Sequence, residues 1–214
     1  MKAYWIGGDI GCEGAEVDRS WWRDCWPELA CPKCQTLKPL AVPFPIDVVL
    51  HESTDCECLG PLSFLHRPEG LGMPLLGTIE VIDVLLADEL GLESRGFALG
   101  SVSCGGRVVN SHWTVVEPAS LRIPGYSDSP VAWYSRCDTC GRRFEHIPWG
   151  QTWYRDADVR GLDVFGGCGG GLSFVSERLW RSKDLRSWPR LSCREVALQA
   201  DGRPTGETEP CAGL

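Results

Sequence analysis

The chain has 214 residues, a hydrophobic content of 43% and a formal net charge of −8 at pH 7. This hydrophobic content is sufficient for a packed core and excludes a wholly disordered chain. The negative charge disfavours nucleic acid, whose phosphates are bound through Lys and Arg, and favours a basic protein partner.

The predicted elements of the first half begin with a short strand at 3–6, which an irregular acidic segment separates from the first cysteine pair. A second strand is predicted at 46–51, where apolar and β-branched residues cluster. The clearest helix is 79–90, because its apolar residues recur at helical spacing. Thr78 is expected to cap this helix and Gly91 to end it.

The second half of the chain is predicted to consist mainly of strands. They are expected at 97–103, 107–110, 112–117, 131–136, 143–147 and 191–199. Gly105 and Gly106 should form a turn between the first two of these strands. A second helix should run from Glu177 to about Leu185, capped by Ser176.

These elements predict the fold class and the domain organisation. Their mixture indicates an α+β fold with mixed antiparallel strands and two or three helices. We expect a single domain at 1–200, followed by a polar C-terminal tail at 201–214. The sequence has no apolar run long enough for an export signal or a membrane span, which predicts a cytoplasmic protein with reduced thiols.

Two CxxC pairs form the most specific chemical pattern in the sequence, and their members are Cys31, Cys34, Cys137 and Cys140. Four thiolates complete the tetrahedral coordination of one zinc ion and leave no position open for catalysis. Because the pairs are far apart in sequence, a shared ion would join distant parts of one domain. Strands are predicted on both sides of the second pair, whose following glycine suits a zinc knuckle. Gln35 stands where the first pair would have that glycine. The four cysteines are therefore predicted to hold structural zinc in a zinc-ribbon-like pair of knuckles.

Other interpretations of the 12 cysteines remain open. One or both pairs could be ordinary thiols that bind no metal. The first pair could also be a redox dithiol, which requires a cysteine at the start of a helix that lowers its pKa. Pro39 and Pro43 follow this pair closely and oppose such a helix, which makes the redox interpretation the weaker one.

Cys56 and Cys58 lie near His51 and could form a second metal site. Their one-residue gap and proline-rich surroundings favour free thiols instead. The other cysteines lack ligand spacing and are expected to be buried or incidental thiols: Cys12, Cys25, Cys104, Cys168, Cys193 and Cys211.

The sequence contains no recognisable catalytic constellation. The glycine-rich run 166–171 lacks the Lys and Ser/Thr of a phosphate-binding loop and is expected to be a mobile connection. The four histidines are isolated from one another and belong to no metalloprotease or nucleophile motif: His51, His66, His112 and His146. We therefore expect the protein not to be an enzyme.

Taken together, the motifs resemble the myxobacterial double-CxxCG-motif family, whose members are described as immunity proteins of toxin–immunity pairs. The resemblance extends over nearly the whole chain to about residue 200. It rests on the opening Tyr4-Trp5, the two cysteine pairs with Arg136, Gly141 and Arg142 around the second, and the closing segments Asp158–Phe165, Phe174–Leu179 and Arg194–Val196. Gln35 and the additional cysteines depart from the family pattern.

The resemblance implies a non-enzymatic immunity protein that binds and neutralises a cognate toxin in the cytoplasm. It also implies that the four paired cysteines bind zinc. The acidic charge suggests a basic toxin such as a nuclease. Candidate contact residues lie in one acidic stretch, for which a solvated loop is the alternative: Glu13, Glu16, Asp18, Asp24, Trp21 and Trp22. The second functional hypothesis is a zinc-ribbon module in nucleic-acid transactions, which Arg142 and Arg143 would support.

Overall fold

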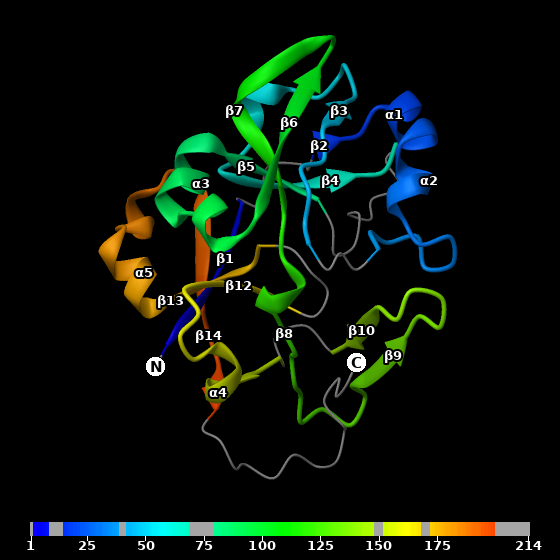
Figure 1. Ribbon diagram of the computed structural model, residues 1–214. Coiled ribbons are helices and arrows are strands. Elements are labelled where there is room, and N and C mark those ends of the chain that lie inside the picture. The colour runs from blue at the N-terminus through cyan, green and yellow to red at the C-terminus, as the bar shows by residue number, and fades with distance from the viewer. Residues whose placement is uncertain are drawn as a thin grey trace.

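The computed structural model describes residues 2–8, 15–38, 42–68, 79–147, 152–167 and 172–199. Within these ranges the chain forms an α+β fold in which strands predominate, as expected (Figure 1). The predicted polar tail at 201–214 and the proposed cap Thr78 lie outside the described residues. Most of the glycine-rich run also lies outside them, apart from Gly166 and Gly167.

The larger sheet has six strands, and a long hairpin of two of them extends from the molecule (Figure 1). Its order is β2 (Ala15–Glu16), β4 (Leu62–His66), β5 (Glu80–Asp83), β7 (Arg107–Val116), β6 (Ala98–Cys104) and β3 (Val48–Leu50). Gly105 and Gly106 form the predicted turn between β6 and β7, with φ angles of 56° and 75°. The predicted break near residue 111 is wrong, because β7 runs unbroken. A register shift between Ser101 and Ser103 of β6 keeps the two strands paired.

The smaller sheet brings the two ends of the described chain together. Its order is β14 (Leu191–Val196), β1 (Ala3–Gly8), β13 (Phe174–Ser176), β12 (Val164–Gly167) and β8 (Arg122–Ile123). The predicted first and last strands are therefore confirmed, and they pair directly with each other. A Cβ atom at Gly7 would lie 2.3 Å from the indole of Trp5, so a larger residue at this position would displace that ring. A further short pair joins β11 (Tyr154–Arg155) to β15 (Leu198–Gln199).

The described chain has five short α-helices, where two or three were predicted. They are α1 (Arg19–Asp24), α2 (Trp26–Leu29), α3 (Val84–Leu90), α4 (Asp156–Val159) and α5 (Glu177–Ser182). Four 3₁₀ turns accompany them: η1 (Cys56–Cys58), η2 (Glu93–Arg95), η3 (Ala119–Leu121) and η4 (Leu185–Ser187). The additional helices α1 and α2 replace the predicted irregular acidic segment. The Asp18 carboxylate starts α1 by accepting hydrogen bonds from the amides of Ser20 and Trp21.

The predicted helix 79–90 is half strand and half helix. The β-branched residues at its start are buried within strand β5, which pairs with β4 and β7. The helix begins only after Asp83, whose carboxylate accepts hydrogen bonds from the amides of Leu85 and Leu86 at 2.8 and 3.3 Å. Gly91 ends it in the left-handed conformation, as predicted. The Ser176 cap of α5 is also confirmed, since its hydroxyl accepts a hydrogen bond from the Leu179 amide at 3.1 Å.

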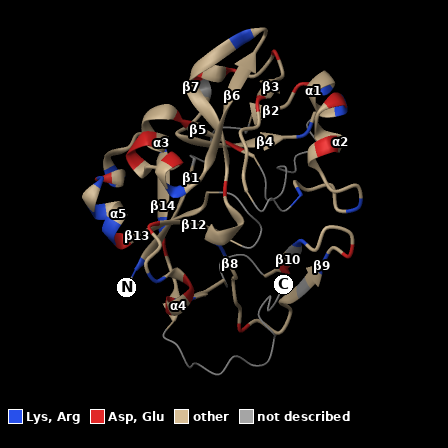
Figure 2. Ribbon diagram, viewed as in Figure 1, with Lys and Arg blue, Asp and Glu red and all other residues tan. Residues whose placement is uncertain are grey.

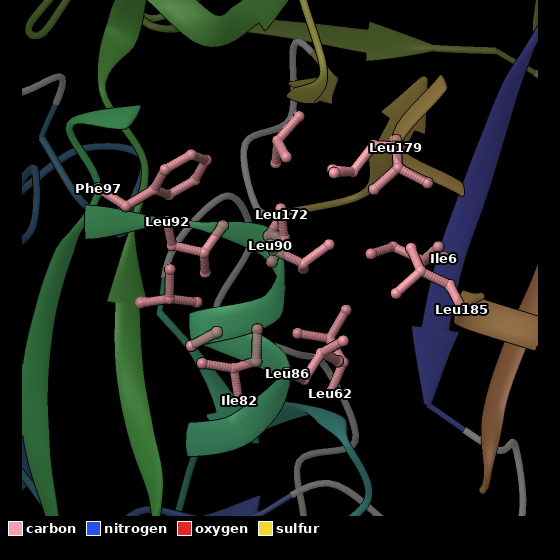
Figure 3. Packing of buried hydrophobic residues seen from close by; sticks show 14 of the residues in the cluster. Ile6, Leu62, Ile82, Leu86, Leu90, Leu92, Phe97, Leu172, Leu179 and Leu185 are labelled. Carbon is pink, nitrogen blue, oxygen red and sulfur yellow. The ribbon is translucent and has the colours of Figure 1, made fainter. Parts of the chain in front are cut away.

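One hydrophobic core joins the two sheets (Figure 3). Ile6 of β1 and Leu62 of β4 belong to the same buried cluster, although their strands lie in different sheets. Leu86 and Leu90 of α3 and Leu179 of α5 close this cluster. A second cluster packs α1 and α2 against the larger sheet, and a third lies beside the smaller sheet. Because the main core uses both sheets, the described chain forms a single domain.

Charge on the surface is interspersed. Figure 2 shows acidic residues on α3 beside basic residues on α5, and Glu89 and Lys183 form an ion pair there at 3.1 Å. In the described part of the chain, no helix has both the length and the apolar character needed to cross a membrane.

Candidate metal centre

The structure brings the four predicted cysteines together at the tips of two short hairpins. The first tip follows α2 and is closed by a bridge between Ala30 and Leu37. The second lies between β9 (Trp133–Arg136) and β10 (Arg143–His146), where Arg136 pairs with Arg143. In each closing pair, one residue directly precedes the first cysteine and the other comes six residues after that cysteine. The two knuckles therefore have the same spacing between their closing residues and their cysteines. Figure 1 shows β9 and β10 beneath α2.

The spacing of the sulfur atoms suits a tetrahedral metal ion. Cys31 Sγ lies 3.8 Å from Cys137 Sγ, and Cys34 Sγ lies 3.6 Å from Cys140 Sγ. All four sulfurs lie within 4.8 Å of one another. Zinc–sulfur bonds of about 2.3 Å place tetrahedral ligands roughly 3.8 Å apart, whereas a disulfide requires about 2.05 Å. The site therefore has the dimensions of a four-thiolate metal centre, and all four cysteines are free thiols here.

The backbones of the two knuckles are equivalent. In each, the amide of the residue after the second cysteine donates to the carbonyl of the first cysteine, at 2.9 Å from Gln35 and 2.8 Å from Gly141. These two residues also share the left-handed conformation, with φ angles of 57° and 72°. The glutamine side chain donates to the Pro32 carbonyl at 2.8 Å. Gln35 thus adopts the geometry of the glycine that it replaces.

Backbone amides favour the thiolate form of the first cysteine in each pair. Hydrogen bonds from the amides of Cys34 and Lys33 lower the pKa of Cys31. Equivalent hydrogen bonds from the amides of Cys140 and Thr139 lower the pKa of Cys137 to about 6. Burial acts in the opposite direction on Cys140 and raises its pKa to about 12. The fold therefore favours the thiolate at two of the four sulfurs, and the thiolate is the form that binds metal.

Two side-chain contacts join the knuckles independently of any metal ion. Arg142 has only 4% of its surface exposed, and its Nη1 donates to the Leu37 carbonyl of the other knuckle at 2.6 Å. The pKa of this arginine is lowered to about 10, chiefly by burial and secondly by repulsion from Arg122. On the surface, Lys33 and Asp138 form an ion pair at 2.6 Å. The pattern CxxCG gave no sign of the Arg142 contact, because its acceptor is a backbone carbonyl far away in sequence.

The structure does not support the redox interpretation of the first pair. A turn spans residues 32–34, and the chain then returns to the bridge at Leu37, so no helix starts at Cys31. The proposed second metal site at Cys56 and Cys58 is not formed among the described side chains, where the four knuckle cysteines are the cluster that could hold an ion. The side chain of Cys58 lies outside the described part.

The residues proposed to contact partners have mixed outcomes. Trp21 is buried, and its indole donates to the Asp47 carbonyl at 2.8 Å, so it is a core residue. Asp18 caps α1, and Asp24 pairs with the adjacent Arg23 at 2.7 Å. Glu13 lies outside the described residues, whereas Glu16 belongs to β2 and Trp22 is only half-buried.

Of the two arginines of the nucleic-acid hypothesis, the one with a described side chain is not available on the surface. Arg142 is buried between the knuckles, and the side chain of Arg143 lies outside the described part.

A metal ion in the four-cysteine centre would be coordinatively saturated. Four sulfur ligands fill a tetrahedral ion and leave no coordination position for a substrate, so the arrangement can cross-link the fold but offers no open metal site. No protein-family model matches the chain, and no curated protein matches it significantly.

Proposed function

We propose that this chain is a non-enzymatic immunity protein that binds and neutralises a cognate protein toxin in the cytoplasm, with zinc in its four-cysteine centre. The observation that carries the proposal is the equivalence of the two knuckles. Gln35 was the clearest departure from the double-CxxCG pattern, and its backbone has the same left-handed conformation as Gly141. Gln35 therefore differs from the pattern in residue type but not in backbone conformation.

Zinc fits the residues present. Thiolate sulfur prefers a borderline-soft ion, and the observed sulfur spacing matches zinc–sulfur bonds. When bound, zinc would supply a structural cross-link and no Lewis-acid chemistry toward a substrate. The chain's own residues prepare the site, because amides stabilise the thiolates of Cys31 and Cys137 while Arg142 places positive charge beside the cluster.

The charge of the chain supports a basic partner. A net charge of −8 favours fast, oriented association with a positively charged protein, and a toxin that degrades nucleic acid would carry such a charge. The burial of Arg142 weakens the competing view of the knuckles as a nucleic-acid-binding module.

Metal analysis tests the zinc centre. Purified protein should contain about one zinc ion per chain, and a chelator should remove it with loss of stability. Cys140→Ser should reduce the zinc content strongly, whereas the control Cys193→Ser changes an exposed thiol of β14 and should not. Full stability without any bound metal would contradict the zinc assignment.

Co-expression tests the immunity function. The gene adjacent to the one encoding this chain is expected to encode a toxin, and co-expression of this chain should suppress its lethality. The two purified proteins should also form a stable complex in gel filtration. Failure to rescue cells from that neighbour, together with salt-sensitive binding of DNA or RNA by this chain alone, would favour the nucleic-acid module instead.

A further inference from the structure

Two cysteines outside the metal centre lie at one edge of the larger sheet. Cys104 is the last residue of β6 and pairs with Leu50 at the end of the edge strand β3. Cys56 begins η1, a few residues after that strand. Both side chains are half-buried and pack against the core cluster beneath α1 and α2.

The two thiols converge on the same backbone oxygen. Cys56 Sγ and Cys104 Sγ each donate to the Thr54 carbonyl at 3.6 Å, and Cys104 Sγ also lies 3.4 Å from the His51 carbonyl. Because both sulfurs contact one oxygen atom, they can be no further apart than twice that distance. The turn at 51–54 therefore holds the two thiols near each other.

We propose that Cys56 and Cys104 are an oxidation site, which a low-molecular-weight disulfide such as oxidised glutathione converts to an intramolecular disulfide. In the first step, the Cys104 sulfur attacks one glutathione sulfur, a mixed disulfide forms, and one glutathione thiolate leaves. In the second, the Cys56 sulfur attacks Cys104 of the mixed disulfide and displaces the second glutathione. The two cysteines lose two electrons and two protons, and one glutathione disulfide becomes two glutathione thiols.

The surroundings assign the order of these steps. Burial is the main cause that raises the pKa of Cys56 to about 12. Cys56 is therefore a neutral thiol near pH 7 and a poor first nucleophile, which leaves the initial attack to Cys104.

The disulfide would change the sheet edge. It would link η1 covalently to the end of β6, beside the edge strand β3. The end of β3 would then be less free to separate from β6. It would also close the chain between residues 56 and 104 into a loop, which restricts the unfolded state. Oxidation is therefore expected to raise the melting temperature by several degrees. Neither cysteine belongs to the four-cysteine cluster, so the four ligands need not take part.

The test is oxidation of the zinc-loaded protein in a glutathione buffer, followed by alkylation and fragment mass mapping. The expected product has lost two hydrogens, retains its zinc and carries a Cys56–Cys104 cross-link. Cys56→Ser and Cys104→Ser should each abolish this product. Cys58→Ser is the matched control, because it changes the neighbouring thiol of the same segment and should leave the cross-link intact.

Zinc content serves as the check on folding for each variant. A wild-type protein that keeps its zinc but forms no cross-link under oxidising buffer would overturn the proposal. A cross-link that persists in Cys104→Ser, or disappears in Cys58→Ser, would overturn it as well, because the reacting pair would then be a different one.

Discussion

At the scale of single residues, Gln35 and Gly141 show how one backbone geometry is reached by two sequences. A left-handed φ angle costs a residue with a Cβ atom about 1–2 kcal/mol, and glycine avoids that cost. We predict that Gly141→Ala lowers the free energy of unfolding by about 1 kcal/mol or more. The new Cβ would also lie 3.2 Å from Arg136 Nη2. Gln35→Ala is the matched control and should cost less than Gly141→Ala, since that site already carries a Cβ and loses only an exposed hydrogen bond to Pro32. Equal losses in denaturant titrations of the two zinc-loaded variants would contradict this explanation.

Glu80 gives a residue-scale prediction of pH dependence. It has 4% of its surface exposed and accepts a hydrogen bond from the Leu172 amide at 2.8 Å. Burial, and then repulsion from Glu117, raise its pKa well above the ordinary value of 4.5. Above about pH 4.5, Glu80 keeps its proton in the folded chain but loses it in the unfolded chain. The free energy of unfolding therefore falls as the pH rises through this range.

Glu80→Gln should consequently be more stable than the wild type at pH 7, because the neutral amide keeps an acceptor for Leu172 without the charge. The gain should shrink as the pH falls toward 4.5. Urea titrations across this range measure it, with the exposed Glu93→Gln as control. A gain that does not vary with pH would show that ionisation of Glu80 is not its source.

At the scale of elements, α3 shows why its start was misjudged. Ile79, Val81 and Ile82 fit a helical pattern, but they are buried in and beside a strand that pairs on both sides. Apolar periodicity over so short a window cannot separate the two structures. The deciding residue is Asp83, whose carboxylate satisfies the first helical amides.

This capping role predicts a measurable loss. Asp83→Ala should lower the free energy of unfolding by about 1 kcal/mol, the usual cost of removing an N-cap. Asp88→Ala, an exposed position on the same helix, should have an effect within about 0.5 kcal/mol. If both substitutions cost the same, the loss would reflect a general effect of charge removal.

At the scale of the whole molecule, the metal centre joins the α2 region to the β9–β10 hairpin. We predict that removing zinc lowers the free energy of unfolding by about 3 kcal/mol or more, because the ion cross-links distant chain segments. Thermal unfolding with and without chelator measures the loss, and restoring zinc should reverse it. Arg142 and the Lys33–Asp138 pair would remain in the metal-free protein, so partial rather than complete loss of contact between the knuckles is expected.

The sequence predicted the four grouped cysteines and most strands, but not how the knuckles meet. CxxC spacing is a local pattern, so Cys137 and Cys140 were recognisable with the strands on either side. The Arg142 contact and the Cys56–Cys104 pair depend on segments that only the tertiary fold brings together. Helix α1 was missed because its start relies on a single capping carboxylate, Asp18, in an otherwise acidic stretch, and α2 was missed because no side chain caps its start.

The position of β1 has a consequence for the order of folding during synthesis. This strand is made before the other described elements, whereas its two partners, β13 and β14, come more than 160 residues later in the chain. The smaller sheet therefore cannot close until nearly the whole chain is available. Contacts between such distant segments slow folding and expose unpaired strand edges in the meantime. A nascent chain would accordingly hold β1 unpaired while the knuckles, complete once Arg143 is made, could already meet.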